Sequence, residues 1–220
     1  MKDTPKALQI TPDLYTYLVE HGTPPDEIQQ ELIEKTKEVG DLSIMQIAPE
    51  QGAFMTMLAR LIGAKRAIEI GTFTGYSALC TARGLTEDGT LLCCDISEEW
   101  TAIARPFWEK AGVAQKIDLR IGPALDTLRS LPQDRHFDMA FLDADKINQA
   151  AYFEEIVQRM RPGGVMMVDN VLMFGRVVDA SVDTPEVQAI RKFNQMVAHD
   201  PRVECVMLGI ADGLTFLRVL

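Results

Sequence analysis

The sequence has few cysteines, and their arrangement suits neither a zinc site nor a disulfide framework. Its four cysteines form no C-x-x-C pair, and its three histidines lie in polar, turn-like segments where none is expected to act directly. Cys93 and Cys94 are neighbours in an apolar run, so on a strand they would point to opposite faces. With no export signal, we expect reduced structural thiols at Cys80, Cys93, Cys94 and Cys205.

Basic residues and long apolar runs are also scarce. Lys and Arg number 22 against 32 Asp and Glu, which gives the chain of 220 residues a net charge of −10. Such a surface repels phosphate, so nucleic acids and anionic membranes are poor candidates for partners. No apolar run approaches the roughly 20 residues of a membrane span, and residues 1–5 are followed by no apolar stretch typical of a secretory signal. We expect a cytoplasmic protein.

The overall amino-acid composition is typical of a globular protein. Hydrophobic residues make up 47% and charged residues 25%, with 15 Gly and 11 Pro, which excludes disorder, collagen and a coiled coil. We find no internal repeat. The length predicts a single domain over residues 1–220 with one substantial core, divided into a helical N-terminal part (1–62) and an α/β core (63–220).

The N-terminal part is predicted to be helical. Thr11 is suited to cap a first short helix, with Pro12 in its first turn. A second helix opens near residues 24–27 and runs to Val39, where Gly40 closes it. A loop over 43–49 leads to a third helix at 50–62, because apolar residues recur there at helical spacing.

From residue 64, short apolar runs alternate with amphipathic stretches. Strands are expected at 66–70, 90–94, 117–121, 137–142, 165–168, 203–208 and 214–219, and helices at 76–83, 98–111, 125–131, 150–160 and 185–198. This alternation favours a parallel sheet with right-handed crossovers. The last two strands have no helix between them and should form a hairpin with one antiparallel member. We predict a seven-stranded, mostly parallel sheet with helices on both faces, which binds ligands at the carboxyl ends of its strands.

Two glycines follow the first expected strand. Gly71 and Gly75 are spaced G-x-x-x-G, and Phe73 occupies the place of the second glycine of a dinucleotide-binding G-x-G-x-x-G fingerprint. This counts against NAD and FAD. The N-terminal amides of the next helix suit a smaller ligand carboxylate, and Ser77 can add a hydroxyl.

Acidic residues mark the first two expected strands. Glu69 lies inside an apolar strand, where a carboxylate needs a partner; it serves a ligand or forms a salt bridge with a neighbouring Arg or Lys. Asp95 ends the second strand, where it binds the hydroxyls of a ribose or caps the next helix. The segment 122–124 after the third strand is short enough to pass beside a flat ring.

Further acidic residues end the fourth and fifth strands. Asp143, Asp169 and Asn170 should converge at one edge of the sheet, where two carboxylates repel one another unless a cation lies between them. Their hard oxygens select Mg²⁺, Mn²⁺ or Ca²⁺ over Zn²⁺. Alternatively, Asp143 and Asp169 merely cap the loops after their strands. Asp145 is expected to be solvated.

Lys146 follows this acidic segment. A lysine near a metal in a pocket of low dielectric can lose its proton, so Lys146 could act as a base. Alternatively, it forms an ion pair with Asp145 or another acid.

Together these segments resemble the cation-dependent O-methyltransferases, the family of catechol and caffeoyl-CoA O-methyltransferases. The similarity covers nearly the whole chain, and the short N-terminal part looks like that of bacterial members. The motifs that carry it, very specific in their order and spacing, are IMQIAPEQ (44–51), EIGTFTGYS (69–77), CD (94–95), GPAL (122–125), FLDADK (141–146), VDNVL (168–172) and DGLT (212–215).

The resemblance implies a Rossmann-like class I methyltransferase fold, S-adenosylmethionine as cofactor, and a homodimer. It implies that the cofactor site is lined by Met45, Glu69, Gly71, Thr72, Ser77, Asp95, Ala124 and Asp143. It implies that Asp143, Asp169 and Asn170 hold the metal. Lys146 matches the position assigned as proton acceptor, so Lys146 and Asp143 are the catalytic candidates.

Two segments depart from the family pattern. Relatives often carry Tyr after the Asn that follows the Lys, whereas here Asn148 is followed by Gln149, with Tyr152 three residues further on. Many relatives also have Trp and His where this chain has Met173 and Phe174. Both segments border the acceptor pocket in the family, so the exact acceptor stays open.

We therefore expect methyl transfer from S-adenosylmethionine to one hydroxyl of a catechol-like small molecule or its CoA ester, with Mg²⁺ as the preferred ion. The alternatives are a nucleotide-dependent oxidoreductase, a non-catalytic ligand-binding module and a nucleic-acid methyltransferase. The glycine spacing disfavours the first, the metal set with Lys146 disfavours the second, and the net charge of −10 disfavours the third.

Overall fold

The computed structural model describes residues 8–220, so the expectation about a signal in residues 1–5 lies outside the described part. Seven strands of this part form one sheet in the order β3-β2-β1-β4-β5-β7-β6. They are β1 (Arg66–Ile70), β2 (Thr90–Asp95), β3 (Ile117–Ile121), β4 (Phe137–Leu142), β5 (Met160–Asp169), β6 (Val203–Leu208) and β7 (Leu214–Val219). β1 to β5 pair in parallel, and β7 pairs antiparallel with both β5 and β6. The predicted sheet and its terminal hairpin are confirmed.

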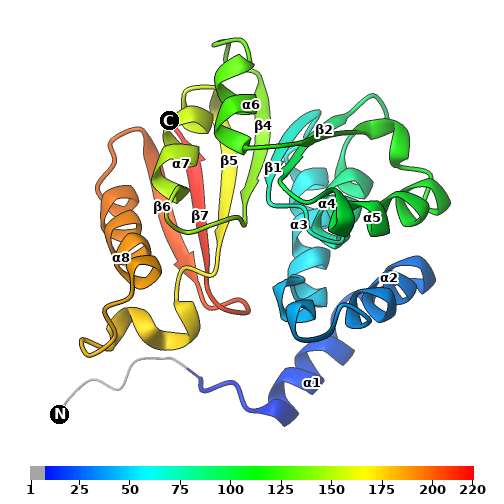
Figure 1. Cartoon of the computed structure of the whole chain (residues 1–220), viewed down its shortest axis with the longest axis horizontal. Coiled ribbons are helices and arrows are strands. Elements are labelled where there is room, and N and C mark those ends of the chain that lie inside the picture. Colours follow the sequence, from blue (N-terminus) through cyan, green and yellow to red (C-terminus); the bar gives the residue numbers. More distant parts are fainter. Residues whose placement is uncertain (1–7) are drawn as a thin grey trace.

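Helices cover both faces of the sheet (Figure 1). Their bounds are α1 (Pro12–Glu20), α2 (Glu27–Lys37), α3 (Pro49–Leu61), α4 (Tyr76–Gly84), α5 (Glu98–Lys110), α6 (Ala124–Ser130), α7 (Gln149–Val157) and α8 (Pro185–Ala198). Short 3-10 helices are η1 (Gly40–Met45), η2 (Ala114–Lys116) and η3 (Met173–Val178). α3, α4 and α5 pack on one face and α6, α7 and α8 on the other. Cys93 and Cys94 belong to these opposite clusters, as predicted.

The N-terminal helices begin at capping residues. Thr11 caps α1 by accepting the N–H of Leu14 at 3.3 Å. α2 begins at Glu27, within the predicted segment 24–27, where Asp26 and Gln29 form a capping box, and it ends at Lys37, two residues before the predicted end. The predicted loop before α3 is partly wrong, since η1 occupies residues up to Met45. No helix within residues 8–220 is long and apolar enough to cross a membrane.

β5 begins five residues before its predicted start. α7 ends at Val157, and the wholly buried Arg159 binds the main-chain carbonyls of Pro132 and Glu155. These contacts anchor the chain at the start of β5, and a register shift against β4 absorbs the irregular segment that follows. The predicted helix over 150–160 is therefore too long at its C-terminal end.

The loops after the parallel strands meet at one edge of the sheet. Asp143 N–H donates to the carbonyl of Ile70 at 2.8 Å, which joins the ends of β4 and β1. Gly71 N–H donates to the carbonyl of Cys94 at 2.9 Å, which joins the ends of β1 and β2. Figure 1 shows α1 and the segment after β5 at this same end of the sheet.

Candidate functional site

A cleft of about 870 Å³ opens at this edge of the sheet, within the range of roughly 300–1,000 Å³ usual for small-molecule sites. Loops from both halves of the sheet line it. The predicted site residues among its lining are Met45, Gly71, Thr72, Ser77, Asp95, Ala124, Asp143, Lys146 and Asn170. Glu69 and Asp169 do not line it and are buried, each in or at the end of a strand that leads to it.

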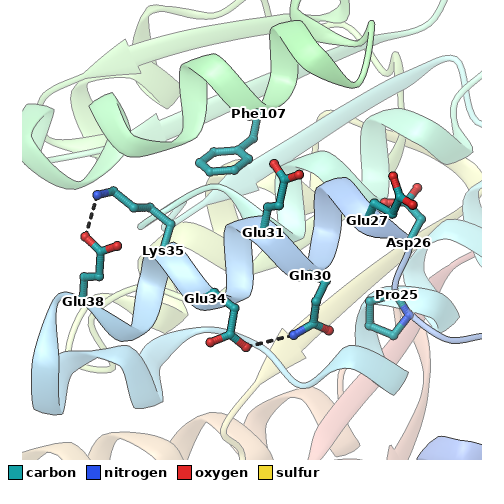
Figure 2. A pocket seen from close by; sticks show the side chains of 9 residues that line it. All are labelled: Pro25, Asp26, Glu27, Gln30, Glu31, Glu34, Lys35, Glu38 and Phe107. Atoms are coloured by element: carbon teal, nitrogen blue, oxygen red, sulfur yellow. Dashed lines mark hydrogen bonds and ion pairs between the residues drawn. The ribbon is translucent and has the colours of Figure 1, made fainter.

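A second, more open concavity of about 690 Å³ lies over α2 and Phe107 of α5 (Figure 2). Most of its acidic side chains already have partners. Glu38 pairs with Lys35 along the helix, whereas Glu31 pairs with Lys110 of α5 and Asp26 with Arg83 of α4, both at 2.6 Å. None of the predicted site residues lies there. We interpret this face as a solvated helix surface and the first cleft as the candidate active site.

Gly71 sets the turn that opens the cleft. Its φ of +88° lies in the left-handed region, and a Cβ there would lie 2.1 Å from the main-chain oxygen of Asp143. Only glycine therefore lets the loops after β1 and β4 pass this close to one another.

Asp95 stabilises the same turn by accepting hydrogen bonds from its main chain. Its Oδ2 accepts the N–H groups of Thr72 and Phe73 at 2.8 and 2.7 Å, and its Oδ1 accepts the N–H of Ser97 at 2.8 Å. The cap of α5 is Ser97 itself, whose Oγ accepts the N–H of Trp100. Asp95 thus shapes both loops, and it also faces the cleft as the ribose interpretation requires.

The N-terminus of α4 is available to an anionic group. Gly75 occupies the N-cap position with a φ of 84°, and no side chain caps the helix. Gly122, on the other side of the cleft, has open space where a side chain would begin. Among residues 8–220, the buried Thr72 Oγ1 and Glu69 Oε2 also lack a hydrogen-bond partner. These free donors, acceptors and spaces fit a ligand with a carboxylate, a cationic group and a flat ring.

Glu69 is completely buried within β1. No Lys or Arg of residues 8–220 forms an ion pair with it, so the salt-bridge alternative is wrong. Its Oε1 lies 3.9 Å from Cys93 Sγ, and the hydroxyls of Ser77 and Thr72 lower its pKa only in part. Burial, which penalises the charged form, raises the pKa of Glu69 to about 8. Within the part of the chain that the structure describes, no cationic side chain stabilises the charge of this carboxyl group.

Asp143, Asp169 and Lys146 form a cluster at the ends of β4 and β5. Lys146 Nζ lies 3.3 Å from Asp143 Oδ1 and 3.4 Å from the main-chain oxygen of Asp169. The alternative of an ion pair thus applies, with Asp143 as the partner rather than Asp145. Asp145 is exposed and instead accepts the hydroxyl of Tyr152 at 2.6 Å.

The two carboxyl groups of the cluster share one cationic neighbour. Burial raises the pKa of Asp143, and Lys146 opposes that shift. Burial also raises the pKa of Asp169, and repulsion from Asp143 adds to it. Within residues 8–220 no group of three His, Cys, Asp or Glu side chains gathers. Asn170 follows Asp169 and lines the same cleft. Two carboxyl groups with only one ammonium beside them, together with an amide oxygen, fit a divalent cation such as Mg²⁺ in the chemistry of their donors.

Sequence reasoning missed two polar residues of this region. Gln51 of α3 is wholly buried and donates to Asp169 Oδ2 at 3.0 Å. Asp212 lines the cleft, and its Oδ1 accepts the N–H of Phe174 at 2.6 Å. Asp212 lies in the DGLT motif but had no role assigned, and nothing near Gln51 in the sequence signals its contact.

The segment that lines the outer end of the cleft is apolar and has an unusual backbone conformation. Met173 and Phe174 line it with φ values of 48° and 54°, which non-glycine residues rarely adopt. Phe174 is 70% exposed. The hydrogen bond from its N–H to Asp212 holds this segment at the mouth of the cleft.

Comparison with known proteins gives a consistent result. The family model for O-methyltransferases matches residues 19–220. The chain is 39% identical over 214 residues to probable caffeoyl-CoA O-methyltransferase 1 of Dictyostelium discoideum (96% of this chain, 93% of the relative). It is 41% identical over 226 residues to caffeoyl-CoA O-methyltransferase 2 of Zea mays (97% and 85%).

Solved structures agree with these sequence matches. The O-methyltransferase TomG of Streptomyces achromogenes, in complex with SAM, superposes with a TM-score of 0.86 at 32% identity (94% of this chain, 96% of the other). An O-methyltransferase of Bacillus cereus, in complex with SAH, superposes with a TM-score of 0.85 at 34% identity (93% and 96%).

Proposed function

The chain belongs to the O-methyltransferase family, and from this premise we propose that it transfers the methyl group of S-adenosylmethionine to one hydroxyl of a catechol-like small molecule or its CoA ester, with a divalent cation. The observation that carries the proposal is the meeting of Asp143, Asp169 and Lys146 beside the glycine turn of Gly71. The oxidoreductase, binding-module and nucleic-acid alternatives find no support in the comparisons.

S-adenosylmethionine supplies, when bound, an electrophilic methyl group on a sulfonium. We assign its site to the inner cleft, which is lined by Met45, Gly71, Thr72, Ser77, Asp95, Ala124 and Asp143, together with the buried Glu69 of β1. The free amides of α4 suit its carboxylate, and Glu69 suits a cationic group because it has no cation of its own. Two structural neighbours were solved in complex with SAM or SAH, which supports this assignment.

We assign the divalent cation to Asp143, Asp169 and Asn170. When bound, it would lower the pKa of an acceptor hydroxyl and fix the position of a vicinal pair. Mg²⁺ is the preferred ion, with Mn²⁺ or Ca²⁺ as possible substitutes, because all three side chains offer oxygen.

Lys146 is the proposed proton acceptor. Its Nζ faces the Asp143–Asp169 pair at the floor of the cleft, within reach of a hydroxyl held there. Lys146 acts here as the neutral amine: it takes the proton from that hydroxyl and becomes an ammonium, the oxygen forms a bond to the methyl carbon, and the bond from this carbon to sulfur breaks. The products are the methyl ether and S-adenosylhomocysteine. Alignment and charge stabilisation supply several kcal/mol each.

The acceptor ring is assigned to the outer cleft. Met173 and Phe174 offer an apolar surface there, and Asp212 adds a carboxyl group behind them. A flat aromatic ring between these residues and Lys146 would present its hydroxyls to the floor of the cleft.

A methyl-transfer screen over a catechol panel tests the proposal. We expect activity toward vicinal diols, no activity toward matched monophenols, complete loss in excess EDTA and recovery on addition of Mg²⁺. Activity that is unchanged in EDTA would remove the cation from the mechanism. Failure of every vicinal diol would refute the acceptor class.

Three further expectations from the sequence stay predictions: a single domain over residues 1–220, a cytoplasmic location and a homodimer. Light scattering coupled to size-exclusion chromatography tests the last.

A further inference from the structure

One buried polar side chain of α3 reaches the acidic cluster. The Nε2 of Gln51 donates to Asp169 Oδ2 at 3.0 Å, across 118 positions of the sequence. The other oxygen, Oδ1, accepts the main-chain N–H of Asn170 at 2.7 Å. Each oxygen of Asp169 is therefore held by one donor, and these two contacts fix the plane of its carboxyl group.

We infer that Gln51 is a positioning residue, which holds the carboxylate of Asp169 in the orientation that binds the divalent cation. The inference rests on the proposed function, because Asp169 is a metal ligand only under that proposal. Groups behind the ligands of a metal orient them, and their loss typically weakens metal binding.

The chemistry of an amide suits this position. A Lys or Arg here would neutralise Asp169 and compete with a cation for it, whereas an acidic residue would add a further repulsive charge. The amide of Gln51 donates an N–H without adding a charge. It therefore holds Oδ2 of Asp169 in place and leaves the negative charge of the carboxylate for the cation.

A purely structural role accounts poorly for Gln51. The side chain is wholly buried, and its Oε1 has no hydrogen-bond partner among residues 8–220. Burying an unpaired amide oxygen destabilises a fold. A methionine has nearly the same length and would fill the space without burying that oxygen. The amide thus carries a cost to packing, and its contact with Asp169 is the one interaction that explains it.

The test compares Gln51→Met with the wild-type enzyme in a titration with Mn²⁺. Free Mn²⁺ is followed by electron paramagnetic resonance, with S-adenosylhomocysteine present. We expect about 10–100-fold weaker Mn²⁺ binding in Gln51→Met. The affinity for S-adenosylhomocysteine, measured by calorimetry, should be unchanged, since Gln51 does not line the cleft.

Thr56→Val is the matched control. Thr56 lies on the same helix, and its hydroxyl donates to the carbonyls of Gly52 and Cys80 at 3.0 and 2.8 Å. Thr56→Val therefore removes contacts of α3 without altering any contact of the acidic cluster. Its Mn²⁺ affinity should equal that of the wild type. An equal loss in both variants would mean that any damage to α3 weakens the site, and would overturn the inference.

A second variant, Gln51→Asn, keeps the inference testable if Gln51→Met does not fold. Gln51→Asn keeps the amide but shortens the side chain, so its nitrogen would fall short of Asp169, and the same loss of Mn²⁺ affinity is expected. Wild-type affinity in Gln51→Met or Gln51→Asn overturns the inference. Absence of Mn²⁺ binding in the wild type refutes the metal site of the proposed function instead, and so the two failures are distinguishable.

Discussion

Replacement of Glu69 by glutamine is expected to stabilise the unliganded protein while weakening its cofactor binding. Glu69 is completely buried, lacks a cationic partner, and has its pKa raised from 4.5 to about 8 by burial. The folded state therefore keeps a proton that the unfolded chain releases. The resulting stability is complete below a pH of 4.5 and is lost as the pH rises toward 8.

The size of this loss follows from the shift. Since each unit of pKa corresponds to about 1.4 kcal/mol, release of the Glu69 proton by the unfolded chain, while the folded protein retains it, should remove about 3 kcal/mol of stability between roughly pH 5 and pH 8. Glutamine has nearly the same shape and no charge, so Glu69→Gln avoids the loss. At about 2–4 °C per kcal/mol for a chain of this size, the difference in Tm between variant and wild type should widen by roughly 6–12 °C over that range.

The assay is thermal unfolding of both proteins across the pH range, without and with S-adenosylhomocysteine. Comparing the two proteins cancels the titration of all other groups. We expect the unliganded variant to gain Tm over the wild type as pH rises, and to gain less than the wild type from the ligand. Parallel curves for the two proteins would refute the assigned pKa shift. Equal stabilisation of both by the ligand would refute the placement of Glu69 in the cofactor site.

Other replacements separate the roles assigned within the cleft. Asp169→Ala should abolish turnover and Mn²⁺ binding yet leave S-adenosylhomocysteine binding intact, as calorimetry can establish; joint loss in a folded variant would contradict the assignment. Lys146→Met should lower kcat by about 10²–10⁴ through loss of the proton acceptor while KM for S-adenosylmethionine stays constant, and a kcat near wild type would exclude that role. Phe174→Ala should raise KM for the acceptor and not for the cofactor, since Phe174 lies at the outer end of the cleft; steady-state kinetics with each substrate varied in turn decide this.

Local patterns in the sequence predict most of the fold. The period of apolar residues identifies the strands, and residues such as Thr11, Gly71 and Gly75 mark where elements begin or turn. These signals are local, because a cap or a left-handed turn depends on a few neighbouring residues. The start of β5 was not predictable in this way, since it depends on the contact of Arg159 with the carbonyl of Pro132, 27 residues away.

The sequence by itself determined which chemical groups reach the carboxyl edge of the sheet, because parallel strands bring their ends together whatever their side chains. Only the tertiary structure decided which groups touch. It paired Lys146 with Asp143 rather than Asp145, placed Gln51 on Asp169, and joined Asp212 to the segment at Phe174. The physical reason is that these contacts depend on how α3 and the loops pack against the sheet, and no local spacing of residues encodes that packing.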